Sequence, residues 1–128
     1  MYVDELQYRR FHKWVVNQFA GLQTQGPDVA SANNIKLPAG FLVFEITGTT
    51  ETQLISNIGW HNGSVVTLVF NGSVTVKHGQ ATSGTDITLK LASAANFSAT
   101  ADDTLTLGLC ETTASGQAWR ELARTVTA

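Results

Sequence analysis

From Ile35 to the end of the chain, the sequence is a succession of short apolar segments separated by turn residues. In several of them apolar residues alternate with small or polar ones, as at Leu105, Leu107 and Leu109. Alternation with a period of two predicts strands that bury one face. About seven or eight such strands predict a mainly β fold for residues 35–128, an antiparallel β-sandwich or jelly roll. The predicted strands include residues 41–47, 53–58, 65–70, 73–78, 87–91, 104–109 and 118–126.

The strongest local signal lies in the two neighbouring segments 65–70 and 73–78. They are separated by Asn71-Gly72, a dipeptide that tolerates the positive φ angles of a type I′ turn. We therefore predict a two-residue hairpin, whose register would allow His61 to approach His78. The first of the two segments is apolar on both faces, which is typical of a strand that is covered on both sides.

Residues 1–26 have a different pattern, in which apolar side chains recur every three or four residues. This spacing predicts a helical arm with one apolar stripe. The aromatic stripe, as we call it, consists of Tyr8, Phe11, Trp14, Val15, Phe19 and Leu22. Residues 27–34 are small or polar without apolar periodicity, and they predict a linker between the arm and the body.

A single amphipathic helix cannot bury its stripe alone. It must fold back on its own body, bundle with copies of itself or dock into a partner. The stripe is short and aromatic, which argues against a long coiled coil. A membrane-surface helix is a weaker alternative, because the basic cluster Arg9, Arg10 and Lys13 is small. We therefore expect the stripe to be an assembly interface, with no membrane as partner.

Composition narrows the classes of function. The 128 residues include only 14% charged residues and carry a formal net charge of -2, which gives no electrostatic reason to expect nucleic acid as a partner. No stretch is long enough for a membrane span, and the N-terminus does not resemble a signal peptide, so we expect folding in the cytoplasm of the producing cell. Cys110, the only cysteine, is expected to be a small buried residue.

Residues that could carry chemistry are few. No cysteine or carboxylate is spaced to complete a metal site with His12, His61 or His78, so structural or surface roles are favoured over a metal site or general base. Asp102-Asp103 is expected to serve a turn. No nucleophile elbow or phosphate-binding loop occurs in the sequence. We expect no enzymatic activity and no cofactor.

A possible glycan contact is the run Trp60, His61 and Asn62, because an exposed tryptophan can stack on a sugar ring. The alternative interpretation places Trp60 in the core or at a subunit contact.

The body resembles a small β-domain of tailed-phage virion proteins, including capsid decoration proteins, head fibres and the terminal domains of tail fibres and spikes. The similar segments are Leu37–Gly40, Gly63–Phe70, Thr75–Gly79, Asp103–Leu107 and Trp119–Arg124, in that order. The resemblance covers roughly residues 35–126.

This resemblance implies a homotrimer that serves in assembly or surface attachment. Trp119, Glu121 and Arg124 would then close the last strand and help to fix the trimer, with a Glu121–Arg124 ion pair. A small body with a docking arm is expected to be a capsid decoration (cement) protein, located in the virion and bound to the major capsid protein or another virion protein. The alternative is a tail adaptor or a receptor-binding module that recognises host glycan.

Overall fold

The computed structural model describes residues 25–127, and these form strands together with one short 3-10 helix, η1 (Ala92–Ala94). The predicted mainly β class is confirmed. The helical arm was predicted for residues that lie almost wholly outside the described range. The strands are β1 (Val29–Ala30), β2 (Asn34–Ile35), β3 (Val43–Thr47), β4 (Leu54–Ser56), β5 (Val65–Phe70), β6 (Val74–Val76), β7 (Asp86–Lys90), β8 (Phe97–Ala99), β9 (Thr104–Thr112) and β10 (Gly116–Thr125).

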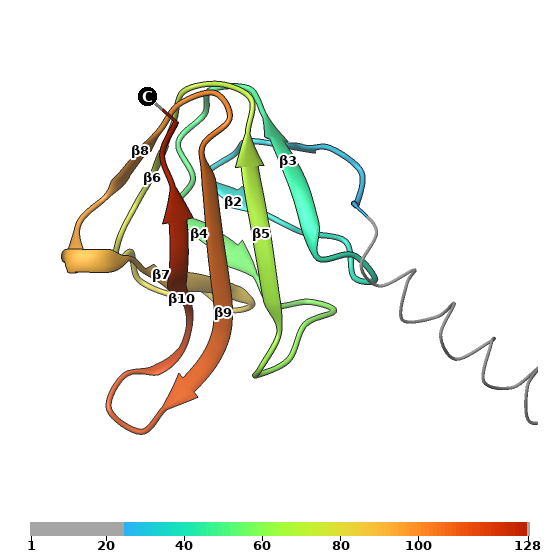
Figure 1. The fold of residues 1–128 in the computed structure, drawn as a ribbon. Coiled ribbons are helices and arrows are strands. Elements are labelled where there is room, and N and C mark those ends of the chain that lie inside the picture. Colours follow the sequence, from blue (N-terminus) through green and yellow to red (C-terminus); the bar gives the residue numbers. More distant parts are fainter. Residues whose placement is uncertain (1–24, 128) are drawn as a thin grey trace, which may run out of the picture.

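Eight of these strands form one sheet in the order β1-β3-β5-β9-β10-β7-β4-β2. The first and last strands of this order are joined by residues 31–33, so the sheet curls round and is nearly closed (Figure 1). β6 and β8 form a separate antiparallel pair. Phe70 at the end of β5 contacts Phe97 of β8 edge to face, with 6.1 Å between ring centroids, which packs the small sheet against the large one.

The strand directions differ from the prediction. β1–β3, β3–β5, β2–β4 and β7–β10 are parallel pairs, whereas β4–β7, β5–β9 and β9–β10 are antiparallel. The predicted antiparallel sandwich is therefore wrong, and the fold is a mixed, nearly closed sheet. The reason is that β4 lies between β3 and β5 in sequence but does not pair with either of them. It pairs with β2 and β7 instead, near the other end of the strand order. The chain thus returns to β5 in the direction of β3.

The predicted hairpin between residues 65–70 and 73–78 is also wrong. β5 pairs with β3 and β9, while β6 pairs with β8. Neither Asn71 nor Gly72 has a positive φ, so the type I′ turn does not form. The physical reason is burial. Val74 and Val76 are covered when β6 pairs with β8, and this tertiary contact overrides the local turn signal.

Residues 27–34 are part of the sheet rather than a free linker. Val29 and Ala30 of β1 pair with Ile46 and Thr47 of β3. The Ser31 amide donates to the Thr47 carbonyl at 2.7 Å, which continues the contact. The described chain is therefore attached to the sheet from its first residues.

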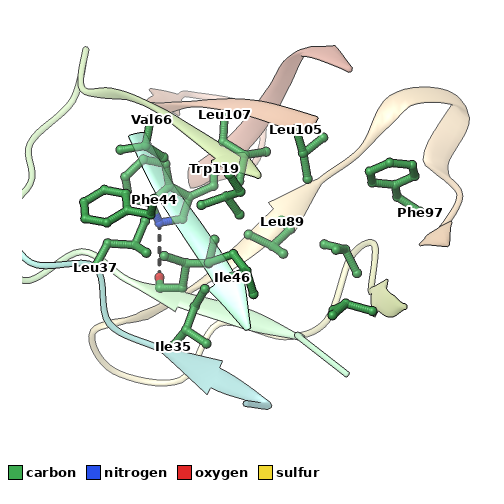
Figure 2. Packing of buried hydrophobic residues seen from close by; sticks show 14 of the residues in the cluster. Ile35, Leu37, Phe44, Ile46, Val66, Leu89, Phe97, Leu105, Leu107 and Trp119 are labelled. Atoms are coloured by element: carbon green, nitrogen blue, oxygen red, sulfur yellow. Dashed lines mark hydrogen bonds between the residues drawn. The ribbon is translucent and has the colours of Figure 1, made fainter. Parts of the chain in front are cut away.

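The core lies inside the nearly closed sheet and is built by the inward residues of the alternating strands. Trp119 is fully buried at its centre, where Figure 2 shows it between Phe44, Leu89 and Leu107. Its indole Nε1 donates to the Ile55 carbonyl oxygen at 3.1 Å, so its polar group is satisfied. The predicted inward direction of Leu105, Leu107 and Leu109 is confirmed, because all three are buried.

Candidate functional site

The loop that contains Trp60, His61 and Asn62 lies between β4 and β5 and meets the turn between β9 and β10. Trp60 is half-buried and packs against the core. Its ring contacts Phe44 and Trp119 at centroid distances of 6.3 and 6.2 Å, and its Nε1 donates to the Leu37 carbonyl at 3.0 Å. Trp60 therefore anchors the loop to the core, and its ring nitrogen already has an acceptor.

His61 and Asn62, in contrast, are exposed. The Nδ1 atom of His61 lies 3.2 Å from the Ser64 hydroxyl oxygen, which also accepts the His61 backbone N–H at 3.1 Å. Asn62 belongs to a chain of side-chain amides. Asn57 donates to Gln117 Oε1 at 2.9 Å, and Gln117 donates to Asn62 Oδ1 at 2.9 Å.

We call this loop end of the molecule the amide cluster, comprising Asn57, His61, Asn62, Glu111 and Gln117. Asn62 Nδ2 reaches Glu111 Oε2 at 3.5 Å, so a carboxylate closes the chain of amides. Amides and a carboxylate are groups that hydrogen-bond to polyols. The structure thus brings the three predicted residues to one end, but it divides them between a buried anchor and a polar surface. Asn57, Glu111 and Gln117 were missed because they are assembled by contacts between the β4–β5 loop and the ends of β9 and β10, which are distant in sequence.

The histidines are not brought together in the predicted way. The hairpin that would have let His61 approach His78 does not form, because Val65 of β5 pairs with Gly108 of β9. His78 Nδ1 accepts the Leu91 backbone N–H at 2.9 Å, and the His78 backbone N–H donates to Asn96 Oδ1 at 2.9 Å. His78 therefore connects the loop between β6 and β7 to the segment between β7 and β8. Within residues 25–127 no group of three or more histidine, cysteine or acidic residues could hold a metal ion, and His12 lies outside this range.

The predicted Glu121–Arg124 ion pair is present at the end of β10. Arg124 donates to Glu121 through Nε at 2.7 Å and through Nη2 at 2.6 Å. The Arg124 guanidinium carbon also lies 4.2 Å from the centre of the Phe97 ring. Glu121 Oε1 accepts the Ala92 backbone N–H at 3.0 Å, which attaches β10 to η1. The pair therefore clamps the last strand onto the segment before β8.

Electrostatics follow from this geometry. The hydrogen bond from Arg124 lowers the pKa of the Glu121 carboxyl below its usual value, although burial acts in the opposite direction. The same hydrogen bond raises the pKa of Arg124. Trp119, which was grouped with this pair as an assembly residue, is fully covered by its own chain and has no surface for direct contact with another subunit.

Cys110 is exposed, so the expectation of a buried residue is wrong. Since Leu109 points into the core, its neighbour in the strand points outward.

A second depression, which sequence reasoning missed, lies along the small sheet. The register of β6 and β8 places Thr75 opposite Ser98, with Thr49 and Glu51 on the adjacent loop. Glu51 Oε2 lies 3.9 Å from Lys77 Nζ, and Glu51 Oε1 accepts from the Gln53 side chain at 2.9 Å. The groove is therefore lined largely by serine and threonine residues, and its carboxylate is paired with Lys77 and accepts a hydrogen bond from Gln53.

The outer face of the large sheet carries exposed apolar side chains. Val65 of β5 is 43% exposed and Leu122 of β10 is 59% exposed. The sequence signal was the apolar character of both faces of β5, which indicates a strand covered on both sides.

No protein-family model, no curated protein and no solved structure matches the chain. Among residues 25–127, no helix has the length and apolar character needed to cross a membrane.

Proposed function

We propose that this chain is a virion structural protein of a tailed phage, a trimeric capsid decoration protein that binds the capsid surface and stabilises it. In this proposal the body is the outer knob, and the arm engages the capsid or neighbouring protomers. The protein is made in the host cytoplasm, becomes part of the virion and has no catalytic role.

One observation carries the proposal: the braced, nearly closed sheet has exposed apolar side chains on its outer face, and it follows a segment whose sequence predicts a helical arm with an aromatic stripe. Val65 and Leu122 are the exposed apolar side chains of that face. Contiguous exposed apolar surface marks interaction sites in stable proteins. The similarity of the body segments to small virion β-domains supplies the kind of assembly.

The Glu121–Arg124 clamp is consistent with a rigid body, one that keeps its shape when neighbouring subunits pull on it. The clamp ties β10 to η1 through Ala92 and covers Phe97. A decoration protein must resist deformation while it holds neighbouring capsid subunits, and paired strands fixed by side-chain contacts suit that task.

Two experiments test the proposal. Light scattering coupled to size exclusion should give about three times the 13.7 kDa chain mass. Co-sedimentation with capsids that lack the protein should then show binding that Phe11→Ser with Phe19→Ser abolishes. Asn17→Ser, on the opposite side of the predicted helix, is the matched control. Firm capsid binding by the double variant would contradict the role of the arm.

A second candidate is a receptor-binding or tail-adaptor module that recognises host glycan. The amide cluster favours it, because exposed Asn62, which follows exposed His61 in the chain, lies 3.5 Å from the Glu111 carboxylate. The position of Trp60 argues against sugar stacking on that ring, since Phe44 and Trp119 contact it. A glycan array with the parent and Asn62→Ala tests this candidate. Binding by the parent that the variant loses would favour it over the capsid proposal.

A further inference from the structure

The outer face of β5, β9 and β10 carries the exposed apolar side chains of Val65 and Leu122 and is left open by residues 25–127. A β-bulge between Glu121 and Ala123 interrupts the pairing of β10 with β9, and Leu122 occupies it. Leu122 lies over Gly108, where an added Cβ would come within 3.1 Å of the leucine Cδ1. Val65 is the register partner of Gly108 on the other side. The bulge therefore places Leu122 next to Val65 and makes one apolar patch.

Two hydroxyl groups at the centre of this face are hydrogen-bonded to each other. Thr67 and Thr106 are register partners, and their hydroxyl oxygens are 2.9 Å apart, so one hydroxyl donates to the other. Covering a polar group is costly unless it has a hydrogen-bond partner. An apolar segment that lies across these threonines therefore covers two hydroxyl groups that already share a hydrogen bond.

The described chain begins at the edge of this same face. Gln25 forms a parallel bridge with Val43, and the Gly26 amide donates to the Val43 carbonyl at 2.8 Å. Val43 is the register partner of Thr67, which is in turn that of Thr106. Gln25 therefore lies at one end of the row that leads across the face.

We propose that the aromatic stripe, Tyr8 to Leu22 of the same chain, covers this outer face. The lengths agree. Neighbouring strands are about 4.8 Å apart, so β10 lies four spacings, or about 19 Å, from the segment at Gln25. A helix over residues 8–22 is about 22 Å long. Laid across the strands from Gln25, it reaches β10 and passes over Val65 and Leu122.

Charge complementarity supports this direction. Arg120 of β10 and Lys90 of β7 are register partners, and both alternate with buried core residues, so they point outward at the far side of the face. The ion pairs within residues 25–127 are Lys77–Glu51 and Arg124–Glu121. Arg120 Nη2 donates to Thr112, Ser115 and Gly116 at the β9–β10 turn, so Lys90 and Arg120 both lack a carboxylate there, but Arg120 already has neutral acceptors. An arm laid from Gln25 brings Asp4 and Glu5 to this side.

This inference concerns the free chain and does not depend on the virion proposal. Limited proteolysis with trypsin tests it, because Arg9, Arg10 and Lys13 are cleavage sites within the arm. We expect slow cleavage there in the parent. Leu122→Gln removes one apolar contact of the docked arm and should speed cleavage about tenfold. Ile58→Gln is the matched control, since Ile58 is 48% exposed but belongs to a loop outside the face, and it should leave the rate unchanged.

Dilution distinguishes an arm that docks on its own chain from an arm that docks on a second copy. Docking within one chain predicts a cleavage rate that is independent of concentration. Protection that is lost on dilution would assign the face to the arm of a second copy and overturn the own-chain proposal. Equal cleavage of the parent and Leu122→Gln would overturn docking on this face altogether. Circular dichroism of each variant checks that the body stays folded. No capsid is present, so failure here is separate from failure of the proposed function.

Discussion

The inner and outer faces of β5, β9 and β10 are made by alternate residues of the same strands, yet their surroundings differ. On the inner face Leu105, Leu107 and Trp119 are at most 1% exposed. On the outer face Val65 and Leu122 are 43% and 59% exposed. Apolar side chains thus occur on both sides, but residues 25–127 cover only one. The two faces of one sheet therefore differ: the inner face forms the core of the body, and we propose the outer face as a docking surface.

Hydrogen bonding sharpens this contrast. Inside, the Trp119 indole must find an acceptor in the core, and it donates to the Ile55 carbonyl. Outside, Thr67 and Thr106 bond each other across the strands. The inner contacts are fixed by packing with distant residues, whereas the outer pair is complete within two neighbouring strands. Substitutions on the inner face should therefore lower the free energy of unfolding of the body itself. Substitutions on the outer face should change stability only through a segment that docks on that face.

The largest effect is expected for Trp119→Ala. Removing a fully buried tryptophan leaves a cavity at the centre of the core, so the free energy of unfolding should fall by about 3–5 kcal/mol. Urea denaturation followed by circular dichroism measures this change. Leu122→Ala, on the outer face of the same strand, is the matched control. Similar losses for both variants would contradict the division between the faces.

A smaller loss is expected for Glu121→Ala, which breaks the clamp at the end of β10. The change leaves Arg124 above Phe97 without its acceptor and leaves the Ala92 amide unpaired. The free energy of unfolding should decrease by about 2 kcal/mol. Urea denaturation of Glu121→Ala, Arg124→Met and the double variant gives the coupling energy. Additive losses would show that the ion pair does not act as a unit.

Acid should weaken the body in part through Asp103. Its carboxylate accepts the backbone N–H groups of Thr100 and Thr127, both at 2.8 Å, and these bonds lower its pKa. Because the folded pKa is lowered, the stabilisation is present above the unfolded pKa and is lost as the pH falls through the folded pKa. Asp103→Asn should be less stable than the parent at neutral pH and should show a flatter decline below about pH 4.

The measurement for Asp103 is the urea midpoint as a function of pH. Asp102→Asn is the matched control, since Asp102 is exposed in the same turn. Parallel curves for the parent and Asp103→Asn would remove this carboxylate from the acid response.

Alternation predicted most strands, because each strand buries one face and local sequence records that choice. It did not predict partners, since the pairing of β6 with β8 depends on Val74 and Val76 packing against distant Phe97. The outward direction of Cys110 was available from the alternation that buries Leu109. Strand pairing was therefore the part that local sequence could not supply.

The candidate site was predictable only in pieces. Residues three apart in a regular strand point to opposite faces, so a Glu121–Arg124 contact needs an irregularity. The bulge at Leu122 supplies it and brings both side chains to the same side. The amide cluster required Asn57 and Gln117 to meet across 60 positions of sequence, which no local pattern records.

The smallest effect should come from Leu122→Gln in a chain that lacks residues 1–24. Among residues 25–127, every buried apolar core residue lies between Ile35 and Trp119, so the shortened chain retains this core. With no arm to cover it, exposed Leu122 contributes little, and the free energy of unfolding should change by no more than about 0.5 kcal/mol. In the full chain the same substitution should cost about 1.5 kcal/mol, because the docked arm loses an apolar contact. Urea denaturation of the four proteins measures the difference, and equal costs in the two backgrounds would show that the arm does not stabilise the body through the outer face.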